Sequence, residues 1–368
     1  MNIGLCGFGV VGRGVYEIVR QRPDMKVKKI LCLEDIQLPD AQTVKDFSEI
    51  LNDPEIDTVV EAMGGLHPSY DFARAALEAG KNVVSSNKAM VCTFYDQLVP
   101  LAMHKGVSLR CTAAVGGGIG WLSELERARR VQTINQVGGI MNGTCNYILD
   151  NMTRLGLGYD EALKQAQKLG YAEANPATDV DGIDTWHKVI LSANVAFGIS
   201  LDKTTVPVSG IRNISAADVD CFKAHGKVCK LISTAKRTED GFSAYVQPTL
   251  VAAGSPEGAV PLNYNLITFI GQTSERMSFY GQGAGRYPTA YNVVQDLVDV
   301  TQGKSFYASY GAPQAADNQE AHRYYVRGDW EGSIQEDWST GVITAPVPVS
   351  QMHQWVKDHP DAFIAGVD

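Results

Sequence analysis

The chain has 368 residues, more than the ~100–200 residues of a usual single domain, so we expect two domains. Hydrophobic residues make up 45% and charged residues 20%, which is typical of a globular chain with a large core and excludes wholesale disorder. The net charge of -9 disfavours partners that need a positive field, so we expect no nucleic-acid partner and no membrane partner.

The chain opens with a pattern typical of a dinucleotide-binding unit. Residues 2–6 predict a buried strand, a glycine-rich turn runs from Gly7 to Gly12, and residues 13–21 predict a helix. The glycines permit a tight bend, a close approach to a pyrophosphate and close helix–strand packing, and the helix start presents free N–H groups. Glycine-rich turns also occur without a ligand, so the alternative is a plain strand–helix start.

Two acids stand where a ribose-binding carboxylate is expected. The strand predicted over residues 26–33 ends in Glu34 and Asp35, which lie 22 and 23 residues after Gly12. A carboxylate accepts hydrogen bonds from ribose hydroxyls but repels a 2′-phosphate. No lysine or arginine lies between residues 30 and 44, so we expect no local cation to offset this repulsion. We therefore predict NAD rather than NADP, with Arg13 as the main residue acting against this preference.

Strands and helices alternate up to about residue 122. Helices are predicted over 43–52, 69–79 and 95–105, and strands over 57–62, 82–86 and 107–111. Such repeats imply a parallel sheet with helices on both faces, whose ligands bind beyond the carboxyl ends of the strands. Three polar or glycine-rich segments fall at such ends: Gly64-Gly65, Ser86-Asn87-Lys88 and Gly116-Gly117-Gly118.

The pattern changes after residue 122, where helices and strands are grouped. Helices are predicted over 122–130, 144–155, 159–169 and 183–197, and strand-like alternation over 131–141, 242–251 and 265–270. The fold class is therefore α/β, with a Rossmann-type doubly wound parallel sheet and a second α+β domain. We expect a dinucleotide-binding domain over 1–122, to which a helix over 288–302 returns, a substrate and dimerisation domain over 123–287, and a tail over 303–368 without an assigned role.

A dense polar stretch supplies candidates for acid–base chemistry. Glu173, Asp179, Asp181, Asp184 and Lys188 lie within 16 residues. The last two are four residues apart at the start of a predicted helix, so they share one face. An ordinary ion pair on a helix surface is the alternative. Seven scattered cysteines without a CxxC pair predict free thiols in a reducing cytoplasm, and we expect no structural metal.

Several motifs together resemble the homoserine dehydrogenase family, in order and with matching spacing from residue 2 to about residue 300. They are Val84–Val91 (VSSNKAMV), Val115–Ile119 (VGGGI), Gly139–Leu149 (GIMNGTCNYIL), the stretch GYAEANPATDVDGID that precedes Lys188, and Gly281–Ala290 (GQGAGRYPTA). The resemblance implies reduction of L-aspartate 4-semialdehyde to L-homoserine with a nicotinamide cofactor, within threonine and methionine biosynthesis. It also implies a homodimer or homotetramer.

The resemblance assigns roles to individual residues. Lys188 and Asp184 match the catalytic lysine and aspartate, and Lys88 matches a lysine proposed for proton transfer. Which lysine donates the proton stays open. The residues matched to the substrate pocket are Glu173, Asp179, Tyr171 and Gly143. The residues expected to contact the cofactor are Gly7, Gly9, Val10, Val11, Gly12, Glu34, Gly64, Asn87, Gly283 and Gly285.

One position departs from the family. Thr112 stands three residues before Val115, where the family carries a glutamate that binds a monovalent cation together with backbone carbonyls. We therefore expect such a cation to bind weakly or not at all. Two alternatives to a homoserine dehydrogenase stay open. One is a dehydrogenase of another short hydroxy amino acid, which such a departure allows, and the other is a non-catalytic protein that senses a dinucleotide, because a fold does not fix its function.

Overall fold

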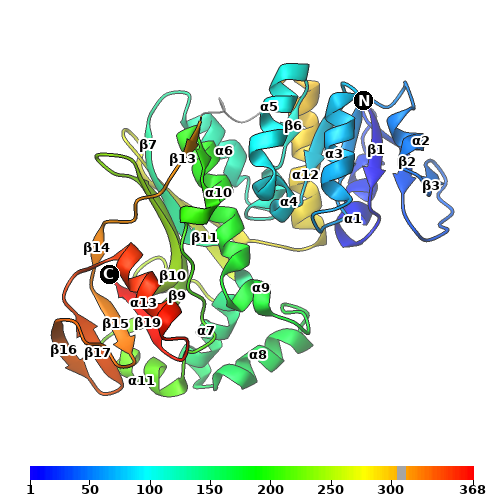
Figure 1. Ribbon diagram of the computed structural model, residues 1–368. Helices are drawn as coiled ribbons and strands as arrows, with labels where there is room; N and C mark the ends of the chain where they lie inside the picture. Colours follow the sequence, from blue (N-terminus) through cyan, green and yellow to red (C-terminus); the bar gives the residue numbers. More distant parts are fainter. Residues whose placement is uncertain (305–311) are drawn as a thin grey trace. The chain divides into compact units, whose positions relative to one another are not determined.

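The computed structural model describes residues 1–304 and 312–368, and the chain divides into two compact units with separate sheets (Figure 1). The first unit comprises Met1–Val131, Asn194–Ser200 and Gln282–Pro313, and the second comprises Gln132–Ala193, Leu201–Gly281 and Gln314–Asp368. The first sheet is parallel and doubly wound and the second is mixed, which confirms the predicted fold class. Within the described residues, no helix has the length and apolar character needed to cross a membrane.

The sheet of the first unit has six parallel strands in the order β3-β2-β1-β4-β5-β6. Because β1 lies between β2 and β4, the chain winds outward in opposite directions from the middle of the sheet. Doubly wound sheets bind ligands at this switch point. The strands are β1 (Asn2–Cys6), β2 (Lys26–Leu31), β3 (Gln42–Val44), β4 (Thr58–Glu61), β5 (Asn82–Ser85) and β6 (Leu109–Arg110).

Helices from both ends of this unit's sequence cover the sheet. They are α1 (Val10–Val19), α2 (Ser48–Leu51), α3 (Ser69–Glu78), α4 (Lys88–Thr93), α5 (Tyr95–Lys105), the 3₁₀ turn η1 (Thr112–Ala114), α6 (Trp121–Ala128) and α12 (Arg286–Thr301). The helix predicted over 43–52 is wrong in its first half. Val44 is instead buried in the edge strand β3, where it pairs with Leu31, and this burial and pairing outweigh the helical pattern.

The late helix α12 packs against α1, although the two are far apart in the sequence. Gly14 makes this contact possible, because an added Cβ there would lie 2.9 Å from the Cβ of Ala290. Helix and strand side chains form one core beneath them, which includes Ile3, Leu5, Val15, Val19, Val293 and Leu297.

The second unit is built on nine strands in the order β12-β11-β7-β9-β10-β19-β15-β17-β16. Its strands are β7 (Ile134–Ile140), β9 (Lys227–Arg237), β10 (Phe242–Ala252), β11 (Tyr264–Gly271), β12 (Glu275–Gln282), β15 (Tyr324–Arg327), β16 (Ile334–Trp338), β17 (Gly341–Thr344) and β19 (Phe363–Val367). The short strands are β8 (Ser200–Leu201), β13 (Pro313–Gln314), β14 (Ala321–His322) and β18 (Val347–Pro348). The helical segments are α7 (Gly143–Leu155), α8 (Tyr159–Lys168), α9 (Ala177–Val180), α10 (Ile183–Phe197), η2 (Lys203–Thr205), α11 (Ala216–Ala224) and α13 (Val349–Asp358).

The C-terminal residues, whose sequence carries no recognised motif, extend the second sheet. Strand β19 pairs in parallel with β10, and β15 continues the sheet on its other side. Tyr324 and Val326 of β15 pack with Met352 and Trp355 of α13. From β15 to β19 the chain forms a strand, a loop, two strands, a helix and a strand. This is the order of a βαββαβ unit in which residues 328–333 replace the first helix.

Candidate active site

The glycine-rich turn between β1 and α1 leaves no room for side chains at two positions. Gly7 has a φ of +97°, and an added Cβ would lie 2.8 Å from the carbonyl oxygen of Ala62 at the end of β4. A Cβ on Gly12 would lie 2.1 Å from the carbonyl oxygen of Gly7. Both positions therefore require glycine, and the backbone of β1, α1 and β4 meets closely at the switch point.

The start of α1 fits a pyrophosphate. Gly9 precedes the helix, no side chain caps it, and nothing lies within 4 Å of the place where its Cβ would be. The first N–H groups of a helix have no partner within the helix and carry a partial positive charge. Val10, which begins the helix, is 66% exposed, so this end of α1 is open to a ligand.

The acidic loop after β2 contains two ion pairs. Arg13 Nη2 lies 3.4 Å from Glu34 Oε2, and Lys45 Nζ lies 2.8 Å from Asp35 Oδ1. The expectation that no local cation accompanies these acids is therefore wrong. Lys45 lies one residue beyond the interval 30–44, and it reaches Asp35 because the chain turns back through β3. Its hydrogen bond and charge lower the pKa of Asp35.

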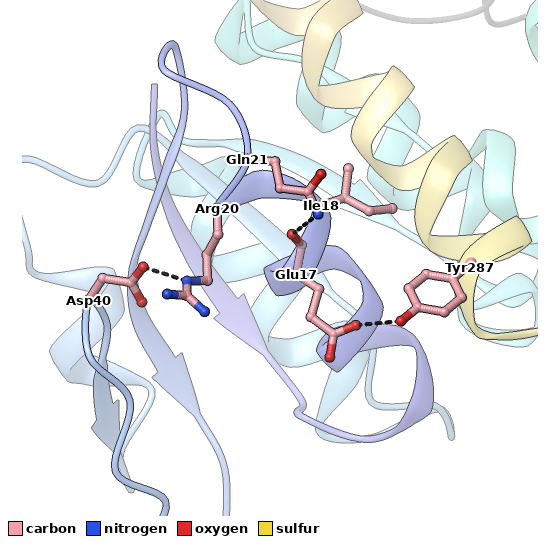
Figure 2. A pocket seen from close by; sticks show the side chains of 6 residues that line it. All are labelled: Glu17, Ile18, Arg20, Gln21, Asp40 and Tyr287. Carbon is pink, nitrogen blue, oxygen red and sulfur yellow. Dashed lines mark hydrogen bonds and ion pairs between the residues drawn. The ribbon is translucent and has the colours of Figure 1, made fainter.

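The same loop is fixed to the second half of α1. Arg20 Nε lies 2.7 Å from Asp40 Oδ2 (Figure 2), and the hydroxyl of Tyr16 also donates to Asp40. Burial, together with this hydrogen bond, raises the pKa of Tyr16 to about 12. These contacts hold the segment that carries Glu34 against the helix.

A surface pocket lies beside these contacts (Figure 2). The side chain of Glu17 on α1 contacts α12, where it accepts a hydrogen bond of 3.0 Å from the hydroxyl of Tyr287. Four of the six lining residues lie at the C-terminal end of α1 or directly after it, whereas the turn expected to bind the pyrophosphate is at the other end of this helix. We therefore assign this pocket to the helix–helix junction. It is lined by Glu17, Ile18, Arg20, Gln21, Asp40 and Tyr287.

A buried carboxylate organises the ends of β4 and β5. Glu61 accepts hydrogen bonds from the hydroxyl of Ser85 at 2.6 Å and from the backbone N–H of Met63 at 2.9 Å. The Ser85 hydroxyl accepts in turn from the N–H of Asn87 at 3.0 Å. The sequence interpretation missed Glu61 and Ser85, although the last residues of a predicted parallel strand point to such a role.

Asn87 and Lys88 begin α4 at this edge of the sheet. The Asn87 side chain caps the helix by accepting from the N–H of Met90 at 3.1 Å, and its amide donates to the carbonyl of Gly65 at 2.7 Å. The cap places Lys88 at the first helical position, half-buried. The bond from Asn87 to Gly65 thus brings the start of α4 next to the turn that contains Gly64.

A buried polar cluster of the second unit is built on α10. Lys188 Nζ lies 2.7 Å from Asp184 Oδ2 and donates to the carbonyl oxygen of Met141 at 2.7 Å. The two side chains are only 9% and 7% exposed. The alternative of an ordinary surface ion pair is therefore wrong. The pair lies at the junction of α10 and the end of β7.

Asn142 connects the acids of this cluster, and the sequence interpretation missed it. Its amide donates to Asp179 Oδ1 at 2.7 Å and to Asp184 Oδ2 at 2.8 Å. Its carbonyl oxygen accepts from the N–H of Cys145 at 2.8 Å and so caps α7. One asparagine thus fixes two predicted site acids and the start of a helix. Its place next to Gly143 in the matched motif was the only signal.

Other predicted residues lie around this cluster without joining it directly. The hydroxyl of Thr144 donates to the carbonyl oxygen of Tyr171 at 2.6 Å, while the side chains of Tyr171 and Glu173 are exposed. Gly143 is packed against backbone, because an added Cβ would lie 2.6 Å from the carbonyl oxygen of Asn263. Asp181 instead pairs with Arg212 at 2.7 Å.

Comparison with known proteins places the chain in a family. A family model described as homoserine dehydrogenase matches residues 121–298, and one described as the NAD binding domain of homoserine dehydrogenase matches residues 7–112. The chain is 34% identical to a homoserine dehydrogenase of Bacillus subtilis over 82% of this chain and 72% of that protein. It is 34% identical to one of Lactococcus lactis over 93% of this chain and 84% of that protein. A crystal structure of a homoserine dehydrogenase from Thiobacillus denitrificans matches with a TM-score of 0.87 and 28% identity, over 100% of this chain and 98% of that one.

Proposed function

Because the chain belongs to the homoserine dehydrogenase family, we propose that Lys188 is the residue that handles the proton of its reaction. The enzyme is an NAD(P)-dependent oxidoreductase that interconverts L-homoserine and L-aspartate 4-semialdehyde. The observation that carries the proposal is the buried contact of Lys188 with Asp184 and the Met141 carbonyl, which fixes one ammonium group among polar partners.

The chemistry of the reaction suits a fixed ammonium group. A bound nicotinamide cofactor supplies or accepts the hydride. Reduction of the aldehyde places negative charge on its oxygen, and a nearby lysine stabilises that charge and delivers a proton. Asp184 holds the lysine in position, and Asn142 holds Asp184. Lys88 is the second candidate proton donor, from the first unit.

The substrate carries an ammonium group that needs an acid. We propose Asp179 and Glu173 for this role, with Tyr171 and the backbone at Gly143 lining the same pocket. Asp179 is supported by its link to Asp184 through Asn142. The exposed side chain of Glu173 remains accessible to a ligand. Charge-assisted hydrogen bonds between ammonium and carboxylate would then orient the reacting carbon.

For the cofactor we propose NAD in preference to NADP, bound by the first unit. The turn from Gly7 to Gly12 would receive the pyrophosphate, and Glu34 would accept hydrogen bonds from the ribose hydroxyls. Gly64, Asn87, Gly283 and Gly285 would approach the nicotinamide half. The support is the open space at Gly9 and the exposed carboxylate of Glu34.

The first unit would bind the cofactor and the second the substrate, and the active form would be a homodimer or homotetramer in the cytoplasm. We further propose that a monovalent cation binds weakly or not at all, because Thr112 supplies a hydroxyl where the family supplies a carboxylate.

A direct assay tests the proposed residues and cofactor together. The purified chain is mixed with L-homoserine and either NAD or NADP, and reduced cofactor is followed by absorbance. We expect turnover with both and higher kcat/KM with NAD. Equal or higher efficiency with NADP would contradict the cofactor proposal, and full turnover of a Lys188→Met variant would contradict the proton assignment.

A further inference from the structure

Arg110, the last residue of β6, is a fully buried arginine surrounded by acids. Its side chain is 0% exposed, and its guanidinium lies 2.8 Å from Asp299, 3.2 Å from Asp296 and 3.3 Å from Glu126. A guanidinium remains charged at any ordinary pH, and its burial is tolerated only where carboxylates and hydrogen bonds compensate it. These three acids come from two helices, α6 and α12, so Arg110 joins the edge of the sheet to both.

Asp296 connects Arg110 to the turn after β6. One of its carboxylate oxygens accepts from the backbone N–H of Thr112 at 2.7 Å, and the other accepts from the Thr112 hydroxyl at 2.6 Å. Burial raises the pKa of Asp296, and the Arg110 guanidinium opposes that rise. The arginine therefore favours the ionised carboxylate that binds Thr112.

The same helix holds the far end of this turn. Asn292, one helical turn before Asp296, donates its amide to the carbonyl oxygen of Gly117. Gly117 has a φ of +51°, and an added Cβ would lie 2.6 Å from the carbonyl carbon of Gly283. The segment from Thr112 to Gly117 is thus tied to α12 at both ends and rests on the glycine loop expected at the cofactor.

The residues at this turn do not fit a monovalent cation of the kind the family resemblance implies. Such an ion binds oxygen ligands and is held more tightly when one of them is a carboxylate, whereas Thr112 supplies a neutral hydroxyl. That hydroxyl is bonded to Asp296 and lies 2.8 Å from the hydroxyl of Ser123. The nearby carboxylate already contacts the Arg110 guanidinium, which would repel a second cation.

We propose that Arg110 acts as a built-in cation: through Asp296 it positions Thr112 and the glycine segment 116–118, so that the enzyme works without an added monovalent cation. Arg110 is a positioning residue, because it reaches the cofactor loop only through other groups. The proposal rests on the proposed cofactor site in one respect, since the segment must lie against the loop that binds the dinucleotide.

The first measurement uses the unmodified enzyme. Activity is compared in sodium, potassium and tetramethylammonium chloride at constant ionic strength. We expect the same kcat and KM in all three salts. Activation by one ion that saturates at low concentration, and is absent in tetramethylammonium, would overturn the proposal. If the chain shows no homoserine oxidation at all, the proton and cofactor assignments fail, whereas the binding measurement below still tests Arg110.

The second measurement removes the charge with Arg110→Met. NADH binding is followed by nicotinamide fluorescence, and KM is measured for both NAD and L-homoserine. We expect roughly ten- to a hundredfold weaker cofactor binding, with a rise in KM confined to the cofactor. The control is Arg74→Met, which removes an exposed arginine of the same unit. Wild-type affinity for NADH, or an equal rise in both KM values, would overturn the proposal.

A third variant decides the matter if Arg110→Met does not fold. Thr112→Val keeps every charge and nearly the same volume but loses the hydroxyl that donates to Asp296. We expect a melting temperature lower by a few degrees, because the buried Asp296 loses one hydrogen bond, and about threefold weaker NADH binding, because one of its two hydrogen bonds to the turn is lost. Unchanged NADH binding in this variant would overturn the positioning role.

Discussion

The groups proposed for the cofactor and those proposed for the substrate lie in very different surroundings. Glu34 in the first unit has a side chain that is 75% exposed, and its ion pair with Arg13 is open to solvent. Lys188 in the second unit is 9% exposed and bonded to two oxygens. Water and salt screen the first pair, whereas the second keeps most of its attraction. Changes at the cofactor loop should therefore adjust cofactor choice, and changes at the lysine should stop turnover.

The largest effect is expected at the buried lysine. Replacing Lys188 by Met keeps the aliphatic stem but removes the charge and the proton, so kcat should fall about 10²–10⁴-fold. The same change at the exposed Lys168 is the control and should leave kcat unaltered. Steady-state kinetics and circular dichroism of both variants provide the measurement. A folded Lys188→Met enzyme with near-wild-type kcat would show that the buried pair is structural, and Lys88→Met would then become the decisive variant.

An intermediate effect is expected at Asn142, which orients the lysine's partner. Asn142→Ser keeps a good cap for α7 but cannot donate to both Asp179 and Asp184. We expect kcat to fall about tenfold with little change in melting temperature. Asn142→Ala should lose the same activity and about 1 kcal/mol of stability in addition, because the cap is also lost. If Asn142→Ser retains full kcat, the link between the two acids is unnecessary.

The two units also differ in how much of their structure the sequence predicts. Five of the six strands of the first sheet follow from local patterns, all but β3, because buried parallel strands, glycine turns and amphipathic helices each leave a signature a few residues long. Strand β9 leaves none, since a lysine interrupts its apolar positions. Lys230 is 2% exposed and donates to Asn146 at 2.9 Å and to the carbonyl oxygen of Val260 at 2.8 Å. Burial lowers its pKa to about 8.

The site residues likewise divide into those that a local motif predicts and those that it does not. Gly7, Gly12 and Lys188 stand in motifs that can be recognised from neighbouring positions. Arg110 cannot be recognised in this way, because its partner Asp296 is 186 residues away in the sequence. An arginine in a predicted strand suggests a polar surface, whereas the fold surrounds this one with carboxylates. Residues such as Arg110 therefore escape prediction because their partners lie in distant segments of the chain.

An effect of similar size, on cofactor choice rather than on turnover, is expected at the exposed acid of the cofactor loop. Glu34→Gln removes the charge that would repel a 2′-phosphate but keeps an acceptor for a ribose hydroxyl. We expect the ratio of kcat/KM for NADP to that for NAD to rise about tenfold, with kcat at saturating NAD unchanged. Asp35→Asn, which loses only the acid paired with Lys45, is the matched comparison and should shift the ratio less. A larger shift at Asp35 would assign the ribose to that residue instead.

The smallest effect is expected at Arg13, which faces Glu34 across 3.4 Å at the open end of α1. Exposed ion pairs contribute little because water solvates both charges, so Arg13→Met should change kcat/KM for NAD by less than about fivefold and leave the melting temperature unaltered. With Glu34→Gln in place, Arg13 no longer has a carboxylate partner there and can approach a 2′-phosphate. The gain in NADP use should then depend on the arginine, and the double variant should lose most of it. Four proteins, the wild type, the two single variants and the double variant, form a cycle that isolates this coupling. An equal gain in NADP use with and without Arg13 would mean that the acid alone sets cofactor choice and that the arginine does not contribute to it.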